Sequence, residues 1–320
     1  MRYTKPALSI PEQIELLKSR GLIIDDHLRV EKYLRSIGYY RLSGYMYHLQ
    51  LADGSHRFKT DVSFDDVIAT YQFDKKLRYL ISEYLERIEV ATRTLLTNEF
   101  SITHGFYWYA DPDRYIKPIK IGAYPDGADR MSMDIHQYIC DYVKHYFSAP
   151  SELFLKKFKN TYTAEAFPPS NMAMEILTMG KLSRLYAQLK KEPETQNVAL
   201  AFHLPIHVFS SWFTYLTNVR NVCAHHSRLW NRKITADRFV IPNRKALQFN
   251  GTLPDDFNTS MYGILSIMIR LLGAFNPHNN LLKKFQNLMA EYPQINISYM
   301  GFPADWEKNP AWDKPVDNEV

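Results

Sequence analysis

The stretch SFDDVIATYQFDKKLRYLISEYLERIEVATRTL, residues 63–95, decides the fold. Its apolar side chains recur mostly at intervals of three or four residues, which places them on one face of an α-helix. Ser63 is followed three residues later by Asp66, a capping pair that marks the start of a helix. The sequence therefore predicts a long amphipathic helix here, the longest helix candidate in the chain.

The other face of this predicted helix is charged. Its charged side chains are Lys75, Lys76, Arg78, Glu83, Glu86, Arg87, Glu89 and Arg93. Glu83 with Arg87, and Glu89 with Arg93, have the i,i+4 spacing of helix-surface ion pairs, which contribute a few tenths of a kcal/mol each. We therefore expect this face to be exposed to solvent.

Helical patterns account for most of the remaining chain. Shorter helices are predicted at 9–21, 26–37, 134–147, 171–191, 256–275 and 278–292, and a further helix is predicted to run from residue 205 through residues 220–232. Residues 101–130, rich in Tyr, Pro, Gly and Asp, break the helical rhythm and predict a long loop between helices. Because we find no internal repeat and no convincing sheet, the predicted class is all-α.

The predicted elements divide the chain into three parts. Residues 1–60 form an N-terminal helical subdomain, residues 61–295 form a helical core with the 101–130 insertion, and residues 296–320 form an extended acidic tail. With 320 residues, 46% of them hydrophobic and 23% charged, the chain is long and apolar enough to bury a sizeable core. It has no signal-peptide core near its start and no run of about 20 apolar residues, so we expect a cytoplasmic protein without a membrane span.

Metal and cofactor sites are not predicted. The two cysteines, Cys140 and Cys223, are too few for a disulfide scaffold or a structural zinc site. His203 and His207 have metal-ligand spacing, but Pro205 lies between them and no glutamate completes a zinc-protease signature. The chain also contains no phosphate-binding glycine loop and no dinucleotide fingerprint, so we expect no cofactor.

The most suggestive chemistry lies in RNVCAHHSRLWNR, residues 220–232, which combines arginine, asparagine and two histidines beside an aromatic ring. A guanidinium binds phosphate oxygens in a planar fork, and an imidazole can transfer protons near neutral pH. This grouping can bind and cleave a phosphodiester. On one regular helix, however, Arg220 and His225 would project roughly 140° apart. Either the helix ends or distorts within 221–224, or a symmetric dimer combines two copies of the motif.

The same region carries a concentrated positive charge. Its charged residues are Arg220, Arg228, Arg232, Lys233, Arg238, Arg244 and Lys245, against the single acid Asp237. The window 220–245 thus has a net charge of +6, whereas the whole chain has only +5. A local basic field fits a polyanionic partner, although a solvated basic surface gives the same pattern.

These residues carry a resemblance to a known family. The segment from Arg220 to His225 resembles the R-N-x-x-x-H form of the motif of HEPN ribonucleases, and the string through Arg232 looks like the signature of the Abi-like abortive-infection proteins, the AbiD/AbiF branch of bacterial phage resistance. Further segments look like that family in the same order. They are GYYRLSGY at 38–45, FDKKLR at 73–78, ERIEVA at 86–91 and GKLS at 180–183.

The resemblance implies a HEPN-like helical bundle with N-terminal additions, and metal-independent RNA cleavage by a homodimer that stops the growth of an infected cell. Arg220 would hold the scissile phosphate, His225 would act as general base or acid, and Asn221 would orient both. His226 satisfies the looser motif spacing as well, and its role is open. The residues expected to contact RNA are Arg228, Trp230, Asn231, Arg232 and Lys233, with base stacking on Trp230.

Other interpretations of the motif are kept. Arg220 can cap a helix end, and the two histidines can satisfy buried polar groups. The protein can also hold a structured small RNA without cutting it, in which case RNA is its partner and not its substrate. A third interpretation is a protein-interaction module that acts through the acidic tail. A partner RNA or an antitoxin that restrains the activity is also compatible with the sequence.

Overall fold

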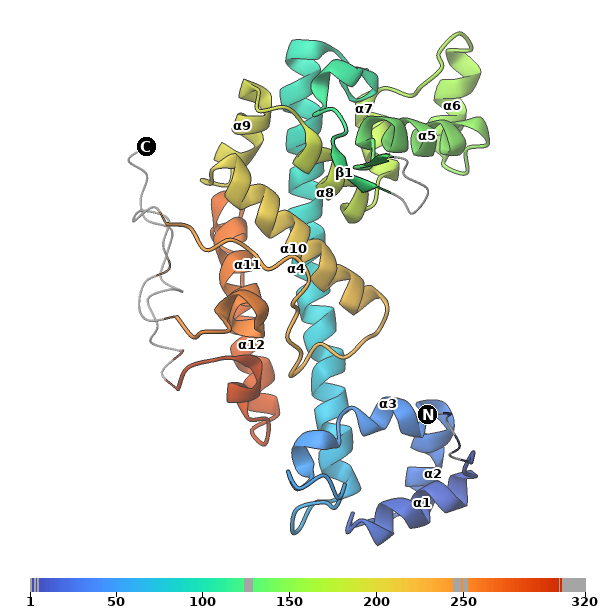
Figure 1. The fold of residues 1–320 in the computed structure, drawn as a ribbon, viewed down its shortest axis with the longest axis vertical. Helices are drawn as coiled ribbons and strands as arrows, with labels where there is room; N and C mark the ends of the chain where they lie inside the picture. Colours follow the sequence, from blue (N-terminus) through green and yellow to red (C-terminus); the bar gives the residue numbers. More distant parts are fainter. Residues whose placement is uncertain are drawn as a thin grey trace.

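One helix, α4 (Phe64–His104), runs along the long axis of the molecule, and the other elements are arranged around it (Figure 1). The computed structural model describes residues 2, 4, 6–123, 129–243, 249, 253–304 and 306, with side chains outside 120–130. The predicted capping pair is confirmed, because both the amide and the hydroxyl of Ser63 donate to an Asp66 carboxylate oxygen at 2.8 Å. At 41 residues, α4 is about 60 Å long.

The long helix extends beyond its predicted end and into the range 101–130 that we expected to be a loop. Leu96 and Phe100, both fully buried, continue its apolar face past residue 95. The helix then ends at Gly105, whose φ of 74° lies in the left-handed region that favours glycine. In the sequence, Gly105 therefore marks the end of the helix, whereas the loss of the helical pattern of apolar residues does not.

The helical core packs directly on α4. Its members are α9 (Pro193–Leu200), α10 (Ile206–Ala224), α11 (Met261–Phe275) and α12 (Leu281–Glu291), while α8 (Met179–Gln188) packs on α10. Large rings fill the interior, including the parallel stack of Phe202, Phe209 and Phe213. Burial of these rings accounts for much of the aromatic content of the chain and stabilises the bundle through lost apolar surface.

The N-terminal subdomain surrounds the first turns of α4 (Figure 1). It consists of α1 (Ile10–Ser19), α2 (His27–Ser36), α3 (Tyr39–Ser43) and the 3-10 helix η1 (Tyr47–Leu49). The tyrosine-rich segment 38–45 therefore contains a short packed helix. Tyr45 is buried, whereas Tyr40 is 93% exposed, so the tyrosines of this segment do not share one role.

The region after α4 contains more structure than the loop we predicted. It holds η2 (Trp108–Ala110), η3 (Pro112–Arg114) and a hairpin of β1 (Lys120–Ala123) and β2 (Asp129–Met131). The helix predicted at 134–147 is confirmed as α5 (Ile135–Ser148), and α6 (Leu153–Thr161) follows it, where no helix was predicted. The predicted helix 171–191 is divided into α7 (Ser170–Ala173), η4 (Met174–Ile176) and α8, because Leu177 is extended and Thr178 begins a new helix. Apart from the small hairpin, the described residues form an all-α fold.

The predicted boundary of an extended tail at residue 296 is wrong. Residues 297–300 form the 3-10 helix η7 (Ile297–Met300). Another 3-10 helix, η6 (Phe257–Thr259), precedes α11. Phe302 then stacks on Phe285 of α12 at 5.3 Å between ring centroids, and Trp306 is buried beside both rings. Aromatic packing therefore holds this segment on the core. Residues 307–320 lie outside the described part of the chain.

Candidate functional site

The histidine motif lies where α10 ends. The helix stops at Ala224, and the amide of His225 still donates to the Asn221 carbonyl at 3.0 Å. His226 then adopts a left-handed conformation with φ of 54°, which turns the chain away from the helix axis. Both imidazoles are exposed. The helix therefore ends within the motif.

A buried carboxylate anchors the chain that follows the histidines. Asp74 of α4 is completely buried and accepts hydrogen bonds from the backbone amides of Leu229 and Trp230, at 3.0 and 2.6 Å. Its second oxygen accepts from the Tyr45 hydroxyl at 2.6 Å and from the Arg78 guanidinium. All sides of the carboxylate are thus satisfied, which is the condition for keeping a charge in a protein interior.

Arg78 is not a surface residue, contrary to our prediction for the charged face of α4. Its side chain is only 6% exposed, and its Nη1 also donates to the Ser227 carbonyl at 3.4 Å. Burial opposes the charged guanidinium, but the neighbouring Asp74 raises the pKa of Arg78 above its ordinary value. The expected surface pair Glu83–Arg87 is present at 3.3 Å. Glu89–Arg93 is present at 2.9 Å, with both side chains partly buried.

Two further arginines tie the motif to the N-terminal subdomain. Arg41 donates to the main-chain carbonyl of His226 at 2.6 Å, and Arg228 donates to the carbonyl of Gly44. Together with the Tyr45 bond to Asp74, these contacts join three segments far apart in the sequence, 38–45, 73–78 and 226–230. The conformation of the histidine-bearing turn is therefore set by residues outside it.

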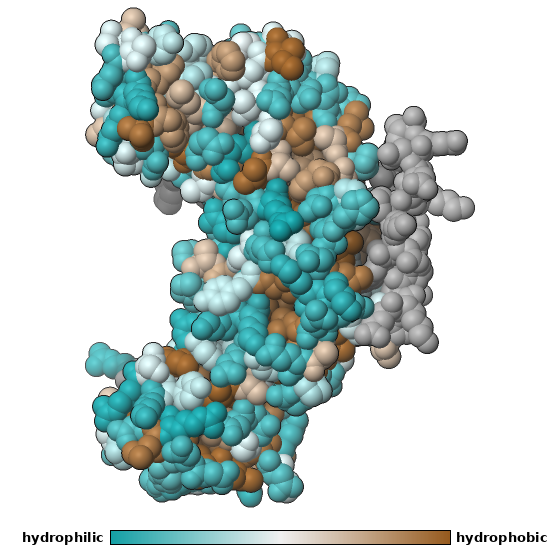
Figure 2. Space-filling view, turned by 180° about the vertical axis from the view of Figure 1, so that it is seen from behind, coloured by the Kyte–Doolittle hydropathy of each residue, from teal (hydrophilic) through white to brown (hydrophobic). Residues whose placement is uncertain are grey.

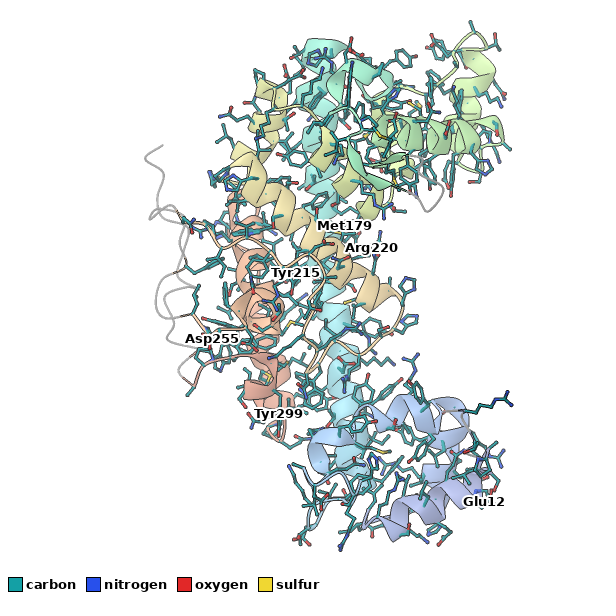
Figure 3. The ribbon with its side chains drawn as sticks, in the orientation of Figure 1. Glu12, Met179, Tyr215, Arg220, Asp255 and Tyr299 are labelled. Carbon is teal, nitrogen blue, oxygen red and sulfur yellow. The ribbon has the colours of Figure 1, made fainter. Side chains whose placement is uncertain are left out.

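Arg220 and Asn221 form a hydrogen-bonded pair in the last two turns of α10. The guanidinium donates to the Asn221 side-chain oxygen at 3.2 Å. Figure 3 shows Arg220 toward the open side of the molecule, while Tyr215 lies on the side toward α11. Asn221 shares a helix face with His225, about 40° away, whereas Arg220 shares a face with Ala224. Within one chain, the Asn221 side chain thus contacts Arg220 and lies on the same helix face as His225.

His225 lines a groove beside the end of α10, which we call the His225 groove. Its lining residues are Asn218, Asn221, Val222, His225, Ser227, Arg232, Lys233, Ile234, Thr235 and Ala236, around about 350 Å³. Arg232 and Lys233 are exposed, and Lys233 also lies 3.3 Å from Asp256. The groove therefore combines an imidazole, amide groups and two cations, which suits a phosphate-containing ligand.

His226 lines a second groove on the other side of the helix end, which we call the tyrosine groove. Its lining residues are Arg41, Tyr71, Lys75, Arg78, Tyr79, Ser82, Cys223, Ala224 and His226, around about 420 Å³. Figure 2 shows the molecule from behind, hollowed on the side where the N-terminal helices and α5 project.

Burial raises the pKa of the Cys223 thiol to about 12, so this cysteine stays protonated and is not a nucleophile near neutral pH.

The expectation that Trp230 stacks on a base is contradicted by the structure. Trp230 is 1% exposed and packs against His48 and Tyr299, at 4.5 and 5.9 Å between ring centroids. Its backbone is fixed by Asp74, so the ring points into the core and offers no free face. The turn that follows α10 carries no helical or strand periodicity from which this burial could be predicted.

The other expected RNA contacts divide into two groups. Arg228 is engaged with the N-terminal subdomain, and Asn231 occupies a left-handed turn with φ of 49° and is only partly exposed. Arg232 and Lys233 are exposed and line the His225 groove. Within the +6 window, Arg244 and Lys245 lie outside the described residues. Lys75 and Tyr79, which the sequence did not single out as site residues, line the tyrosine groove, and their i,i+4 spacing on α4 was the available signal.

The packing of Trp230 leads to a prediction about pH. Burial, together with the nearby charges of Lys59 and Arg228, lowers the pKa of His48 to about 4. Below about pH 6.5 the unfolded chain takes up a proton that the folded chain does not, so the free energy of unfolding should fall as pH drops toward 4. Urea denaturation at pH 7.5 and 5.0 would measure this loss. His48→Phe should reduce it, and an equal loss in both proteins would contradict the assignment.

Three side chains in the described part of the chain are close enough to hold a cation. His104, Glu192 and Glu194 have ligand atoms within 4.8 Å of one another. However, the Arg114 guanidinium donates to Glu192 at 3.0 Å and already supplies a positive charge there. These residues are therefore explained as an ion-pair network between the end of α4 and α9, remote in the chain from the histidine motif.

The fold and the site define a helical protein in which a buried ion pair holds an exposed pair of histidines at a helix end. A family model described as Abi-like protein matches residues 32–231, more than half of the chain. The chain belongs to the Abi-like protein family, and this membership suggests a role in abortive-infection defence against phage. The matched region contains all three segments of the Asp74 network. No curated protein and no solved structure matches the chain.

None of the described helices is both long enough and apolar enough to cross a bilayer.

Proposed function

We propose that this protein is a metal-independent endoribonuclease of the HEPN type that acts in phage defence. The observation that carries the proposal is the end of α10, where the Arg220–Asn221 pair of the helix is followed by two exposed histidines in a fixed turn. The Asp74 network and the Arg41 contact pre-organise that turn, and pre-organised groups stabilise a transition state at little cost in reorganisation. A cytoplasmic location belongs to the same proposal, since the RNA substrates are there.

The chemistry requires only groups that the helix end supplies. One imidazole removes the proton from a ribose 2′-hydroxyl, whose oxygen attacks the adjacent phosphorus. The bond to the 5′-oxygen breaks, and a protonated imidazole returns a proton to that oxygen. The products are a 2′,3′-cyclic phosphate and a 5′-hydroxyl. Arg220 stabilises the charge on the phosphoryl oxygens, while Asn221 holds the guanidinium in place.

A homodimer is part of the proposal. Arg220 and His225 lie on different faces of one helix end, so a single chain does not aim both at one phosphate. A two-fold axis beside the helix end would bring Arg220 of one copy to His225 of the other. His225 is the preferred base because it shares the groove of Asn221, Arg232 and Lys233.

RNA binding without cleavage is the second candidate function. The exposed cations of the His225 groove favour it independently of any catalysis, because they can neutralise phosphates in either case. In that case the bound RNA, or an antitoxin, would be a regulatory partner. A role of the C-terminal segment in protein binding concerns residues 307–320, outside the described chain, and is separable by deleting them.

The two functions can be separated with one defined substrate. An RNA oligonucleotide should be cut in the presence of excess chelator and should yield cyclic-phosphate and 5′-hydroxyl ends. The same oligonucleotide with a single 2′-O-methyl group at the cut site should resist cleavage there, because the nucleophile is blocked. Products bearing 5′-phosphate, or cutting that requires a divalent metal ion, would exclude the proposed mechanism. Binding without any cutting would favour the second candidate.

A further inference from the structure

The tyrosine groove has the composition of a site for single-stranded nucleic acid. Arg41, Lys75 and His226 contribute cationic or titratable groups to it, and Tyr79 contributes a ring that is 61% exposed. Among the described residues that line the groove there is no carboxylate. Asp74, which holds Arg78 of the groove, is buried and neutralised by that guanidinium. The open surface of the groove is therefore positively charged and partly aromatic.

We propose that the tyrosine groove binds an unpaired stretch of RNA, with a base stacked on Tyr79 and the adjoining phosphates bound by Lys75 and Arg41. The inference rests on the proposed action on RNA, but it concerns binding and not cleavage. Lys75 and Tyr79 are one helical turn apart, and the Lys75 ammonium lies 5.8 Å from the centre of the Tyr79 ring. With the ammonium over one face of the exposed ring, it can hold a phosphate while a base stacks on the other face.

The groove is built on rigid elements. Lys75 and Tyr79 project from the first half of a 41-residue helix, and the Tyr71 ring is fixed edge-on against the buried Tyr45 at 5.4 Å. Arg41 is held by its bond to the His226 carbonyl. Because the bases of a duplex are stacked on one another, they are not available to such a ring. The site therefore selects single-stranded over double-stranded RNA.

The position of the groove explains its use. Ala224 and His226, at the end of α10, form one of its walls, and the His225 groove lies on the other side of that helix end. A strand that lies in the tyrosine groove is thus led to the histidine motif. Tyr79 thus takes the base-stacking role that we had expected of Trp230, whose ring is buried.

Binding can be measured without cleavage by using a probe that lacks the nucleophile. A fluorescently labelled 2′-O-methyl oligoadenylate of about 12 nucleotides, alone or paired with its complement, would be titrated with the full-length protein by anisotropy. We expect tighter binding of the single strand. Tyr79→Ala should weaken that binding by about 5- to 150-fold, the range for one stacked base, while Tyr79→Phe should largely retain it. Lys75→Ala should lower the salt dependence by about one phosphate contact.

Matched controls are available in the same chain. Tyr47 is also 61% exposed but does not line the groove, and Lys157 is an exposed lysine on α6. Tyr47→Ala and Lys157→Ala should bind as the wild type does. Equal binding of single strand and duplex, or unchanged binding by Tyr79→Ala, would overturn the inference. Dissociation of a dimer by Tyr79→Ala without loss of RNA binding would instead assign the groove to a second copy and also overturn it.

The outcome is distinguishable from that of the nuclease proposal. If RNA binding depends on Tyr79 but the protein cuts no RNA, the tyrosine-groove proposal is supported and the nuclease proposal is contradicted. If wild type and Tyr79→Ala cut RNA equally well and bind the probe equally well, only the tyrosine-groove proposal is contradicted.

Discussion

Asp74→Ala should destabilise the protein by about 3–5 kcal/mol, the usual cost of removing one partner of a buried ion pair. The substitution leaves the Arg78 guanidinium, 6% exposed, without its counterion. It also leaves the amides of Leu229 and Trp230 and the hydroxyl of Tyr45 without their acceptor. Each unsatisfied buried donor adds its own desolvation cost. Urea denaturation at pH 7.5, followed by tryptophan fluorescence and circular dichroism, would measure the loss.

The matched control is Asp65→Ala, which removes an exposed carboxylate from the first turn of the same helix. Asp65 pairs with Arg29, and such surface pairs contribute less than about 1 kcal/mol. Asp74→Asn combined with Arg78→Met removes both charges while keeping an oxygen for the loop amides, so it should cost less than Asp74→Ala alone. Equal losses for Asp74→Ala and Asp65→Ala would show that the network does not stabilise the fold.

The tryptophan and arginine of the motif show what sequence patterns could not reveal. Helical periodicity located α4 and α10, because a long amphipathic helix repeats its signal over many turns. Trp230 follows the end of α10, where no period remains, and its burial depends on Asp74, 156 residues earlier in the sequence. Arg78 lies at a position on the charged face of α4, yet its side chain is buried and contacts the Ser227 carbonyl of the turn 227–230.

The candidate site was predictable to the same limited extent. The identities of Arg220, Asn221 and the histidines could be read from the motif, and helical geometry showed that Arg220 and His225 diverge. The direction in which each imidazole points could not be read, because it depends on the left-handed conformation of His226 and on the bond from Arg41. The tyrosine groove combines residues from three separate segments, so no local sequence pattern predicts it.

Each catalytic substitution should nearly abolish cleavage. Arg220→Ala removes the charge that stabilises the transition state, for which losses of about 10²–10³ are typical. His225→Ala removes a proton-transfer group, for which about 10²–10⁴ is typical. His226→Ala, at the neighbouring exposed position, is the matched comparison and should lose less. Initial rates on one RNA oligonucleotide in chelator, with folding checked by circular dichroism, would measure these effects. A larger loss for His226→Ala than for His225→Ala would transfer the role of the base to His226.

Mixing the two inactive variants tests whether the site is shared between copies. In a dimer of Arg220→Ala with His225→Ala, one copy keeps its histidine and the other keeps its arginine. If the site pairs Arg220 of one copy with His225 of the other, each mixed dimer contains one intact site out of two. Random exchange makes half of the dimers mixed, so the mixture should recover roughly a quarter of the wild-type rate. Recovery requires subunit exchange, which mixing after partial denaturation and refolding ensures. If both groups acted within one chain, no dimer would contain an intact site and the mixture would remain as inactive as its components.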